Sequence, residues 1–311
     1  MTKPHHPGHA LRILDIKGNS LDDGPGIRSV VFFKGCPLSC VWCHNPESKK
    51  PGPEISFDRA ECVGCDTCLG VCPEHALDRK RPFFIDRNRC TLCGACVESC
   101  PSGALAMVGK SMSVEDIATT VVKDKPFYIN SGGGVTCSGG EPTLYMDFLS
   151  ALLQRLKDEG IHTLLETCGL FDFKAVSQKI LPYTDAIYYD IKIYDPDIHQ
   201  RFCGVRNEMI LENFVSLNAI ASRNGLELLP RTPLIPNITA AKENLTAIAK
   251  FLSAQGIRQA RLLGYNPLWH DKNAKLGLPD TLKQNPAMTA WMSKDELAAC
   301  KAIYSDHGIK T

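Results

Sequence analysis

The chain has 311 residues, 44% of them hydrophobic, so it can bury a substantial core. It carries 35 basic and 34 acidic residues, a formal net charge of +1, and this balance does not favour a nucleic acid as partner. The sequence contains no apolar run of about 18 residues and no apolar stretch near its start, so we expect neither a membrane span nor a signal peptide. The early histidines His5, His6 and His9 are expected in a solvated terminus rather than a metal site.

The first clear element is Arg28–Gly35, whose sequence RSVVFFKG predicts a short buried strand. Pro51, Gly52 and Pro53 then interrupt the pattern, and the chain is rich in cysteine up to about Gly109. Beyond that point strand and helix patterns alternate. The expected strands are Val135–Ser138, His162–Thr167, Ala186–Ile191, Leu226–Arg231 and Gln259–Leu263, and the expected helices are Ser113–Lys123, Leu144–Glu159, Lys174–Ile180, Glu208–Arg223, Lys242–Ala254 and Lys294–Tyr304.

With the first strand, these segments make about six strand–helix units, and their alternation favours parallel strands joined by crossovers. Six units fit either an open doubly wound sheet or an incomplete barrel, and the pattern alone does not distinguish the two. In both folds, ligands bind at the carboxyl ends of the strands. The motifs described below fall at those ends, so we expect one shared site.

Cysteine is the most informative residue type, because 11 of the 15 cysteines fall in three short runs. In a chain without a secretory signal, such runs indicate metal ligands rather than disulfides. The first run, Cys36, Cys40 and Cys43, has the spacing C-x3-C-x2-C. Three thiolates can hold three irons of a four-iron cluster and leave the fourth iron open to a ligand. The spacing leaves two alternatives: a zinc site completed by His44, or three unreactive buried cysteines.

The segment around this run resembles a known family. Residues 23–45 read DGPGIRSVVFFKGCPLSCVWCHN, which closely resembles the signature of the radical S-adenosylmethionine enzymes that activate glycyl radical enzymes. The resemblance covers about residues 15–265. It implies that Cys36, Cys40 and Cys43 hold a [4Fe–4S] cluster whose open iron is chelated by the amino and carboxylate groups of S-adenosylmethionine. Trp42, which is part of the signature, is expected to contact this cofactor.

The other two cysteine runs repeat one pattern, C-x2-C-x2-C-x3-C followed by Pro. This pattern is typical of ferredoxins with two four-iron clusters, in which the fourth cysteine of each run binds the other cluster. Zinc does not explain the repeated fourth cysteine and proline. We therefore assign Cys62, Cys65, Cys68 and Cys100 to one [4Fe–4S] cluster, and Cys90, Cys93, Cys96 and Cys72 to a second.

The ferredoxin-like runs predict a small inserted domain at residues 51–109, with residues 1–50 and 110–311 forming the remainder of the fold. Electron relay to the first cluster is the natural role of such an insert, and docking of an electron donor is the alternative. The simplest members of the resembled family lack an insert, so their core chemistry does not require one.

Glycines and charged residues at the strand ends are the candidate cofactor contacts. In register with the family, Gly139, Gly140 and Glu141 match the motif that binds the methionyl amino group of S-adenosylmethionine. Two glycines also allow a backbone to approach a ligand closely. The resemblance places Glu166 and Thr167 near the cofactor carboxylate.

Three further contacts are expected on the next strands. Lys192 is the expected salt-bridge partner of the methionyl carboxylate, and Asp190 is a further cofactor contact. Arg231 could contact the cofactor or a peptide substrate. Together Glu166, Thr167 and Asp190 could hold a monovalent cation, although the best-known member with such a site has Asp where this chain has Glu166.

These observations predict an incomplete (β/α)6 barrel with an inserted ferredoxin-like domain. The resemblance implies reductive cleavage of S-adenosylmethionine and hydrogen abstraction from a glycine of a partner glycyl radical enzyme. Reduced flavodoxin or ferredoxin is the expected electron donor, and an anaerobic cytoplasm is the expected compartment. The alternatives are a radical enzyme acting on a small molecule or peptide, and a ferredoxin-like electron carrier with a non-catalytic barrel.

Overall fold

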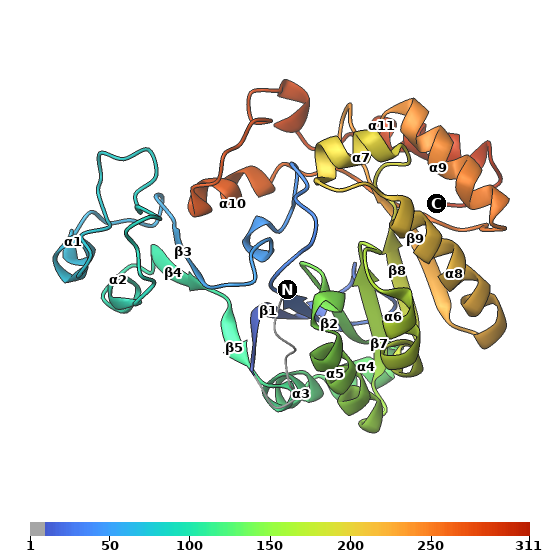
Figure 1. Ribbon diagram of the computed structural model, residues 1–311, viewed down its shortest axis with the longest axis horizontal. Coiled ribbons are helices and arrows are strands. Elements are labelled where there is room, and N and C mark those ends of the chain that lie inside the picture. Colours follow the sequence, from blue (N-terminus) through green and yellow to red (C-terminus); the bar gives the residue numbers. More distant parts are fainter. Residues whose placement is uncertain (1–9) are drawn as a thin grey trace.

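The structure, a computed structural model, describes residues 10–311, so His5, His6 and His9 lie outside the described residues. Its largest feature is an eight-stranded mixed sheet with the order β10-β9-β8-β7-β6-β2-β1-β5 (Figure 1). These strands are β1 (Leu11–Ser20), β2 (Arg28–Phe33), β5 (Lys110–Met112), β6 (Gly134–Gly139), β7 (His162–Thr167), β8 (Ala186–Asp190), β9 (Glu227–Pro233) and β10 (Arg261–Leu263). In the part of the chain from residue 10 onward, no helix is both long and apolar enough for a membrane span.

The six neighbouring strands from β2 to β10 are all parallel, which confirms the six predicted strand–helix units. Their order in the sheet follows their order in the chain without reversal. A doubly wound sheet reverses its strand order at a switch point. The doubly wound alternative is therefore wrong for this chain.

The six predicted helices are present with bounds close to those expected, at α3 (Val114–Val122), α5 (Met146–Asp158), α6 (Phe173–Lys179), α8 (Glu208–Asn224), α9 (Lys242–Ala254) and α11 (Lys294–Ser305). The side chain of Ser113 accepts a hydrogen bond from the Asp116 amide, and the Asp116 carboxylate accepts one from the Ser113 amide. This capping box starts α3 as predicted. The patterns did not indicate α4 (Lys125–Ser131), α7 (Pro196–Cys203) or α10 (Trp269–Leu276), which are only seven or eight residues long.

Side-chain alternation along the parallel strands gives the sheet two different faces. Leu165, Ile187 and Tyr189 point to one face and belong to the main core with residues of α3, α5, α6, α8, α9 and α11. Leu164 and Tyr188 point to the opposite face. Because the helices pack on the first face, the second face is left free for a site at the strand ends.

The cysteine-rich segment forms a lobe at one side of the sheet (Figure 1). This cysteine-rich lobe, residues 54–108, consists of the antiparallel pair β3 (Glu54–Phe57) and β4 (Leu105–Val108) and the short helices α1 (Thr67–Val71) and α2 (Ala95–Glu98). It has a hydrophobic cluster of its own, which includes Ile55, Phe84 and Leu105. The sequence patterns did not predict β1 or β5, which add antiparallel strands to the sheet beside the lobe.

A buried ion pair ties the base of the lobe to the sheet. Lys34, which follows β2, is fully buried, and its ammonium lies 2.9 Å from the Glu54 carboxylate. The same ammonium donates to the carbonyls of Glu47 at 2.6 Å and Lys50 at 2.9 Å. Burial lowers the pKa of Lys34, and Glu54 opposes this effect.

We predict that Glu54→Gln destabilises the protein, because the buried Lys34 ammonium then loses its charged partner. A hydrogen bond to a charged group contributes about 1.5–3 kcal/mol, so the variant should unfold at a clearly lower temperature. Thermal unfolding followed by circular dichroism measures this shift. Glu61→Gln in the exposed part of the lobe is the matched control and should leave the midpoint unchanged. Equal midpoints for both variants would show that the ion pair does not stabilise the fold.

Candidate functional site

A cavity of about 610 Å³ lies at the carboxyl ends of the parallel strands. Its walls come from the loop after β2 and from the ends of β6, β7, β8, β9 and β10. Among the site residues predicted outside the cysteine-rich lobe, all but Glu141 line it: Cys36, Cys40, Trp42, Cys43, Gly139, Gly140, Glu166, Thr167, Asp190, Lys192 and Arg231. The structure therefore brings together residues that are spread over 196 positions of the chain, from residue 36 to residue 231.

The first cysteine run lies in the wall of this cavity. Cys40 is buried, and Cys36 and Cys43 are half-buried. Burial raises the pKa of Cys43 to about 12, so a thiolate at this position needs a cation beside it. Three such thiols facing one cavity are a donor set that fits iron. Trp42, between two of them, is 3% exposed and packs against Phe202.

Gly139 and Gly140 are also required for close packing between strands, which the sequence did not predict. Gly139 has φ +106°, and a Cβ there would overlap the backbone of Phe33. A Cβ on Gly140 would overlap the carbonyl of Gly35. Both glycines thus allow β6 to pack closely against the end of β2, where the cysteine loop begins. They also line the cavity, so the space for a ligand and the close packing depend on the same residues.

Glu141 is fully buried next to the cavity wall rather than in it. Its carboxylate accepts hydrogen bonds from the Thr143 amide and hydroxyl, from the Thr167 hydroxyl at 2.9 Å and from the Cys168 amide at 2.7 Å. With these partners inside the protein, Glu141 joins the end of β6 to the end of β7. The structure gives it a positioning role for the wall of the cavity.

Four charged side chains form a network on the cavity side of β7, β8 and β9. The Arg231 guanidinium donates to the Glu166 carboxylate and lies 3.0 Å from that of Asp190. The Lys192 ammonium lies 3.0 Å from the other oxygen of Asp190. Ser138 donates to Glu166 at 2.6 Å. Asp190 and Arg231 are direct neighbours across β8 and β9, which explains their contact.

The network keeps Asp190 and Lys192 charged despite their surroundings. Burial alone would raise the pKa of Asp190, but Lys192 and Arg231 hold it below its ordinary value. Burial alone would likewise lower the pKa of Lys192, whereas the Asp190 carboxylate raises it. A permanent ammonium therefore faces the cavity, where it can bind an anionic group.

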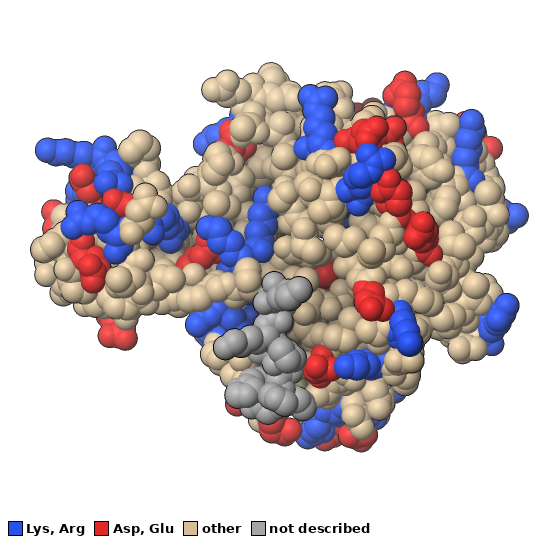
Figure 2. Space-filling model, viewed as in Figure 1, with Lys and Arg blue, Asp and Glu red and all other residues tan. Residues whose placement is uncertain are grey.

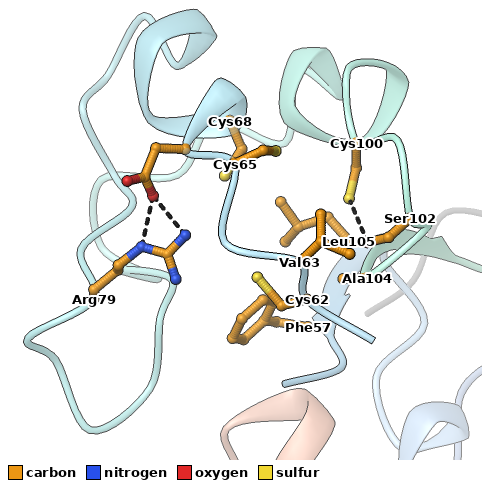
Figure 3. A pocket seen from close by; sticks show the side chains of 11 residues that line it. Phe57, Cys62, Val63, Cys65, Cys68, Arg79, Cys100, Ser102, Ala104 and Leu105 are labelled. Carbon is orange, nitrogen blue, oxygen red and sulfur yellow. Dashed lines mark hydrogen bonds and ion pairs between the residues drawn. The ribbon is translucent and has the colours of Figure 1, made fainter. Parts of the chain in front are cut away.

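The eight cysteines of the lobe gather in two small pockets. Cys62, Cys65, Cys68 and Cys100 line one pocket, shown in Figure 3, and Cys72, Cys90, Cys93 and Cys96 line the other. The fourth cysteine of each run thus lies with the first three of the other run. Among residues 10–311, no three His, Cys, Asp or Glu side chains converge as one metal ion would need. A four-iron cluster instead binds each thiolate to a different iron.

Several residues that line the cavity were not predicted. Asp22, Asp23 and Asn266 contribute to its wall. Cys168, which the sequence indicated as a candidate because it follows Thr167, also lines the cavity and lies beside Cys36. Asp23 belongs to the motif DGPGIR, which could have indicated it. The last residue of this motif, Arg28, is a charged residue at the start of a largely apolar strand. Arg28 is fully buried and donates to Thr136, whose hydroxyl in turn donates to the Asp23 carbonyl.

The chain matches known family models. Residues 87–252 match the Radical SAM superfamily, residues 61–104 match a 4Fe-4S dicluster domain, and residues 22–69 match a 4Fe-4S single cluster domain. The first match includes strands β6 to β9 at the cavity. The second lies in the cysteine-rich lobe, and the third includes the first cysteine run.

The chain is also similar to individual proteins over most of its length. It is 41% identical to the (2S)-3-sulfopropanediol dehydratase activating enzyme of Klebsiella oxytoca over 280 residues, which are 87% of each chain. It is 40% identical to the trans-4-hydroxy-L-proline dehydratase activating enzyme of Clostridioides difficile over 268 residues, 85% of this chain and 87% of the relative. The solved structure of a radical SAM methyltransferase from Sphaerobacter thermophilus shares the fold, with a TM-score of 0.51 and 11% identity over 96% of this chain and 75% of that one.

We predict that Arg231→Met strongly destabilises the protein, because the buried Glu166 carboxylate and the partly buried Asp190 carboxylate both lose the guanidinium that they share. Removal of one partner from a buried ion pair costs about 3–5 kcal/mol. Chemical denaturation of the iron-free protein measures the change. Arg206→Met is the matched control, since Arg206 also pairs with two carboxylates but is 46% exposed, and it should cost at most about 1 kcal/mol. Similar losses for the two variants would contradict the network.

Proposed function

The chain belongs to the family of radical S-adenosylmethionine enzymes that activate glycyl radical enzymes, and from this premise we propose that its residues hold three [4Fe–4S] clusters, one of them at the cavity. When bound, the cluster and S-adenosylmethionine supply reductive cleavage to methionine and a 5′-deoxyadenosyl radical, which takes a hydrogen atom from a glycine of the partner enzyme. The observation that carries the proposal is the set of three thiols, Cys36, Cys40 and Cys43, in the wall of a cavity that also holds a buried charge network.

The protein's own residues bind and orient the cofactor. Lys192 presents its ammonium to the methionyl carboxylate while Asp190 holds it in place at 3.0 Å. Gly139 and Gly140 leave room for the methionyl amino group beside the cysteine loop, and Trp42 contacts the cofactor from that loop. Glu166, Thr167 and Arg231 complete the binding residues. Fixing the cofactor in one orientation is what selects one bond for cleavage.

A monovalent cation does not fit beside these residues. The Arg231 guanidinium already lies between Glu166 and Asp190, the two carboxylates expected to hold the ion. The Thr167 hydroxyl is turned to Glu141 and accepts from the Gly169 amide at 3.0 Å. Arg231 and Lys192 thus already neutralise the two carboxylates.

We propose that the six parallel strands form an incomplete (β/α)6 barrel, made by residues 1–50 and 110–311. Two observations support the barrel: the strand order does not reverse, and the helices lie on one face of the sheet. The radical-carrying loop of a partner enzyme would enter through the open side of this barrel. A peptide needs a wider opening than a small molecule does, which is consistent with the fold.

Residues 51–109 then form the inserted ferredoxin-like domain with the other two clusters. Cys62, Cys65, Cys68 and Cys100 hold one cluster, because they line one pocket. Cys72, Cys90, Cys93 and Cys96 hold the other. The domain relays electrons from reduced flavodoxin or ferredoxin to the cluster at the cavity.

The partner is a glycyl radical enzyme, and the two relatives named above are activating enzymes for dehydratases. On the face in Figure 2, positive and negative side chains are interspersed, which does not favour a nucleic acid as partner. An open iron is exposed to oxidants, so we place the protein in an anaerobic cytoplasm.

The cluster assignment is tested by changing Cys36, Cys40 and Cys43 to Ala together. Wild-type protein reconstituted without oxygen should contain about twelve irons, and the triple variant about eight. The variant should no longer form 5′-deoxyadenosine when reduced, because the iron that binds the cofactor is lost. Iron analysis and chromatography measure the two quantities. A triple variant that still cleaves the cofactor would disprove the assignment.

The role of Lys192 is tested by Lys192→Ala. Loss of a charge-assisted contact should weaken the binding of S-adenosylmethionine about ten- to a hundredfold. The dissociation constant is measured on protein with full iron content. Lys174→Ala, an exposed lysine on α6, is the control and should bind like the wild type. Equal constants for both variants would remove Lys192 from the binding site.

A further inference from the structure

Helix α10 (Trp269–Leu276) lies between the cysteine-rich lobe and the loop that carries Cys36, Cys40 and Cys43, as Figure 1 shows. Its start is anchored in the protein. Trp269 is 1% exposed, and its indole donates to the Tyr265 hydroxyl at 2.9 Å. Both belong to the hydrophobic cluster that includes Cys40 and Trp42. The helix is therefore fixed on the side of the cavity.

One face of α10 holds the loop after the third cysteine. The Lys272 ammonium donates to the His44 carbonyl at 3.1 Å and to the Asn45 side chain at 3.0 Å. It also lies 3.2 Å from the Glu47 carboxylate. These three contacts begin at the residue directly after Cys43.

The end of α10 holds the lobe. The Arg87 guanidinium donates to the Leu276 carbonyl at 3.0 Å and to the Ile55 carbonyl of β3 at 2.7 Å. A cation at the last carbonyls of a helix also interacts favourably with the helix dipole. Lys275 lies 2.9 Å from the Asp58 carboxylate. A Cβ on Gly277, which has φ +65°, would overlap the Phe83 ring, so lobe and helix end are in close contact.

The other attachment of the lobe lies at its base. There Lys34 binds Glu54, and the chain continues from β4 to β5. A two-stranded pair alone is marginally stable, so β3 and β4 benefit from further contacts. The contacts at α10 supply a second attachment: Arg87 binds β3 at Ile55, next to Glu54, and Asp58 and Phe83 meet Lys275 and Gly277 further out on the lobe.

We infer that α10 is a strut that fixes the cysteine-rich lobe at a set distance from the cluster loop, with Arg87 and Lys272 as its positioning residues. The inference rests on the three clusters proposed above. An electron leaving a reduced cluster of the lobe is accepted by the oxidised cluster at the cavity, and this transfer requires a short and constant separation. Lys275 and Asp58 contribute less, because both are partly exposed.

Arg87→Met tests the strut, since methionine keeps the apolar stem over Phe83 but removes both hydrogen bonds. Hydrogen exchange at the Gly277 and Leu278 amides, which bond to α10, should become about ten- to a hundredfold faster. Arg87→Lys keeps the charge and should restore most of the protection. Arg89→Met, an exposed arginine two residues away, is the matched control and should leave the exchange unchanged.

Electron transfer is measured on protein whose clusters are fully reduced and then freed of reductant. After addition of S-adenosylmethionine, the first 5′-deoxyadenosine needs only the electron of the cluster at the cavity. Further product needs electrons from the lobe. Arg87→Met should retain the first product and lose the further product, whereas the Arg89→Met control should form both.

Unchanged exchange, or unchanged further product, in Arg87→Met with full iron content would overturn the strut. Failure of the proposed function would look different, because the wild-type protein itself would then lack the irons of the lobe or form no product. Lys272→Met with full iron should also speed exchange at the Ser48 amide, which donates to the Asn45 carbonyl at 2.9 Å, and equal rates would remove the inner contact from the inference.

Discussion

The burial of charge at the ends of β7, β8 and β9 is the constraint on which the site depends. Glu166, Asp190, Lys192 and Arg231 come from three strands, and each carboxylate has a cation against it. Buried charges are tolerated only when they are paired, so the network holds only if the three strands keep their register. Their register in turn sets where Lys192 faces the cavity. The binding properties of the cavity and the stability of the three strand ends therefore depend on the same four side chains.

The opposite wall depends on close packing rather than on charge. Gly139 and Gly140 let β6 approach the end of β2, and Glu141 then reaches Thr167 and the Cys168 amide on the next strand. The cysteine loop starts where these contacts end. A larger residue at either glycine would move the loop away from the network, so that the thiols and Lys192 would no longer face one cavity.

Strong local patterns made most of this fold predictable. The six parallel strands are short apolar runs between clear helix signals, and the cysteine spacing predicted which thiols would share a pocket. Strand β1 was not predicted although its first half carries buried apolar residues, because its second half is polar and exposed. The eight-residue helix α10 was not predicted, because it is stabilised by contacts with distant residues rather than by its own pattern. The role of Glu141 could not be predicted from the sequence either, because its partner Thr167 is 26 residues away. The pairing of Arg231 with both carboxylates depends on strand order, which the sequence alone leaves open.

A few contacts fix the cysteine-rich lobe to the rest of the protein. At its base the Lys34–Glu54 ion pair is buried, whereas the Lys275–Asp58 ion pair at α10 is partly exposed and therefore weaker. Arg87 links the two attachments, because one guanidinium joins β3, at the residue after Glu54, to the end of a helix anchored beside the cavity. A small number of hydrogen bonds can therefore hold the cysteine-rich lobe in a fixed relation to the cavity.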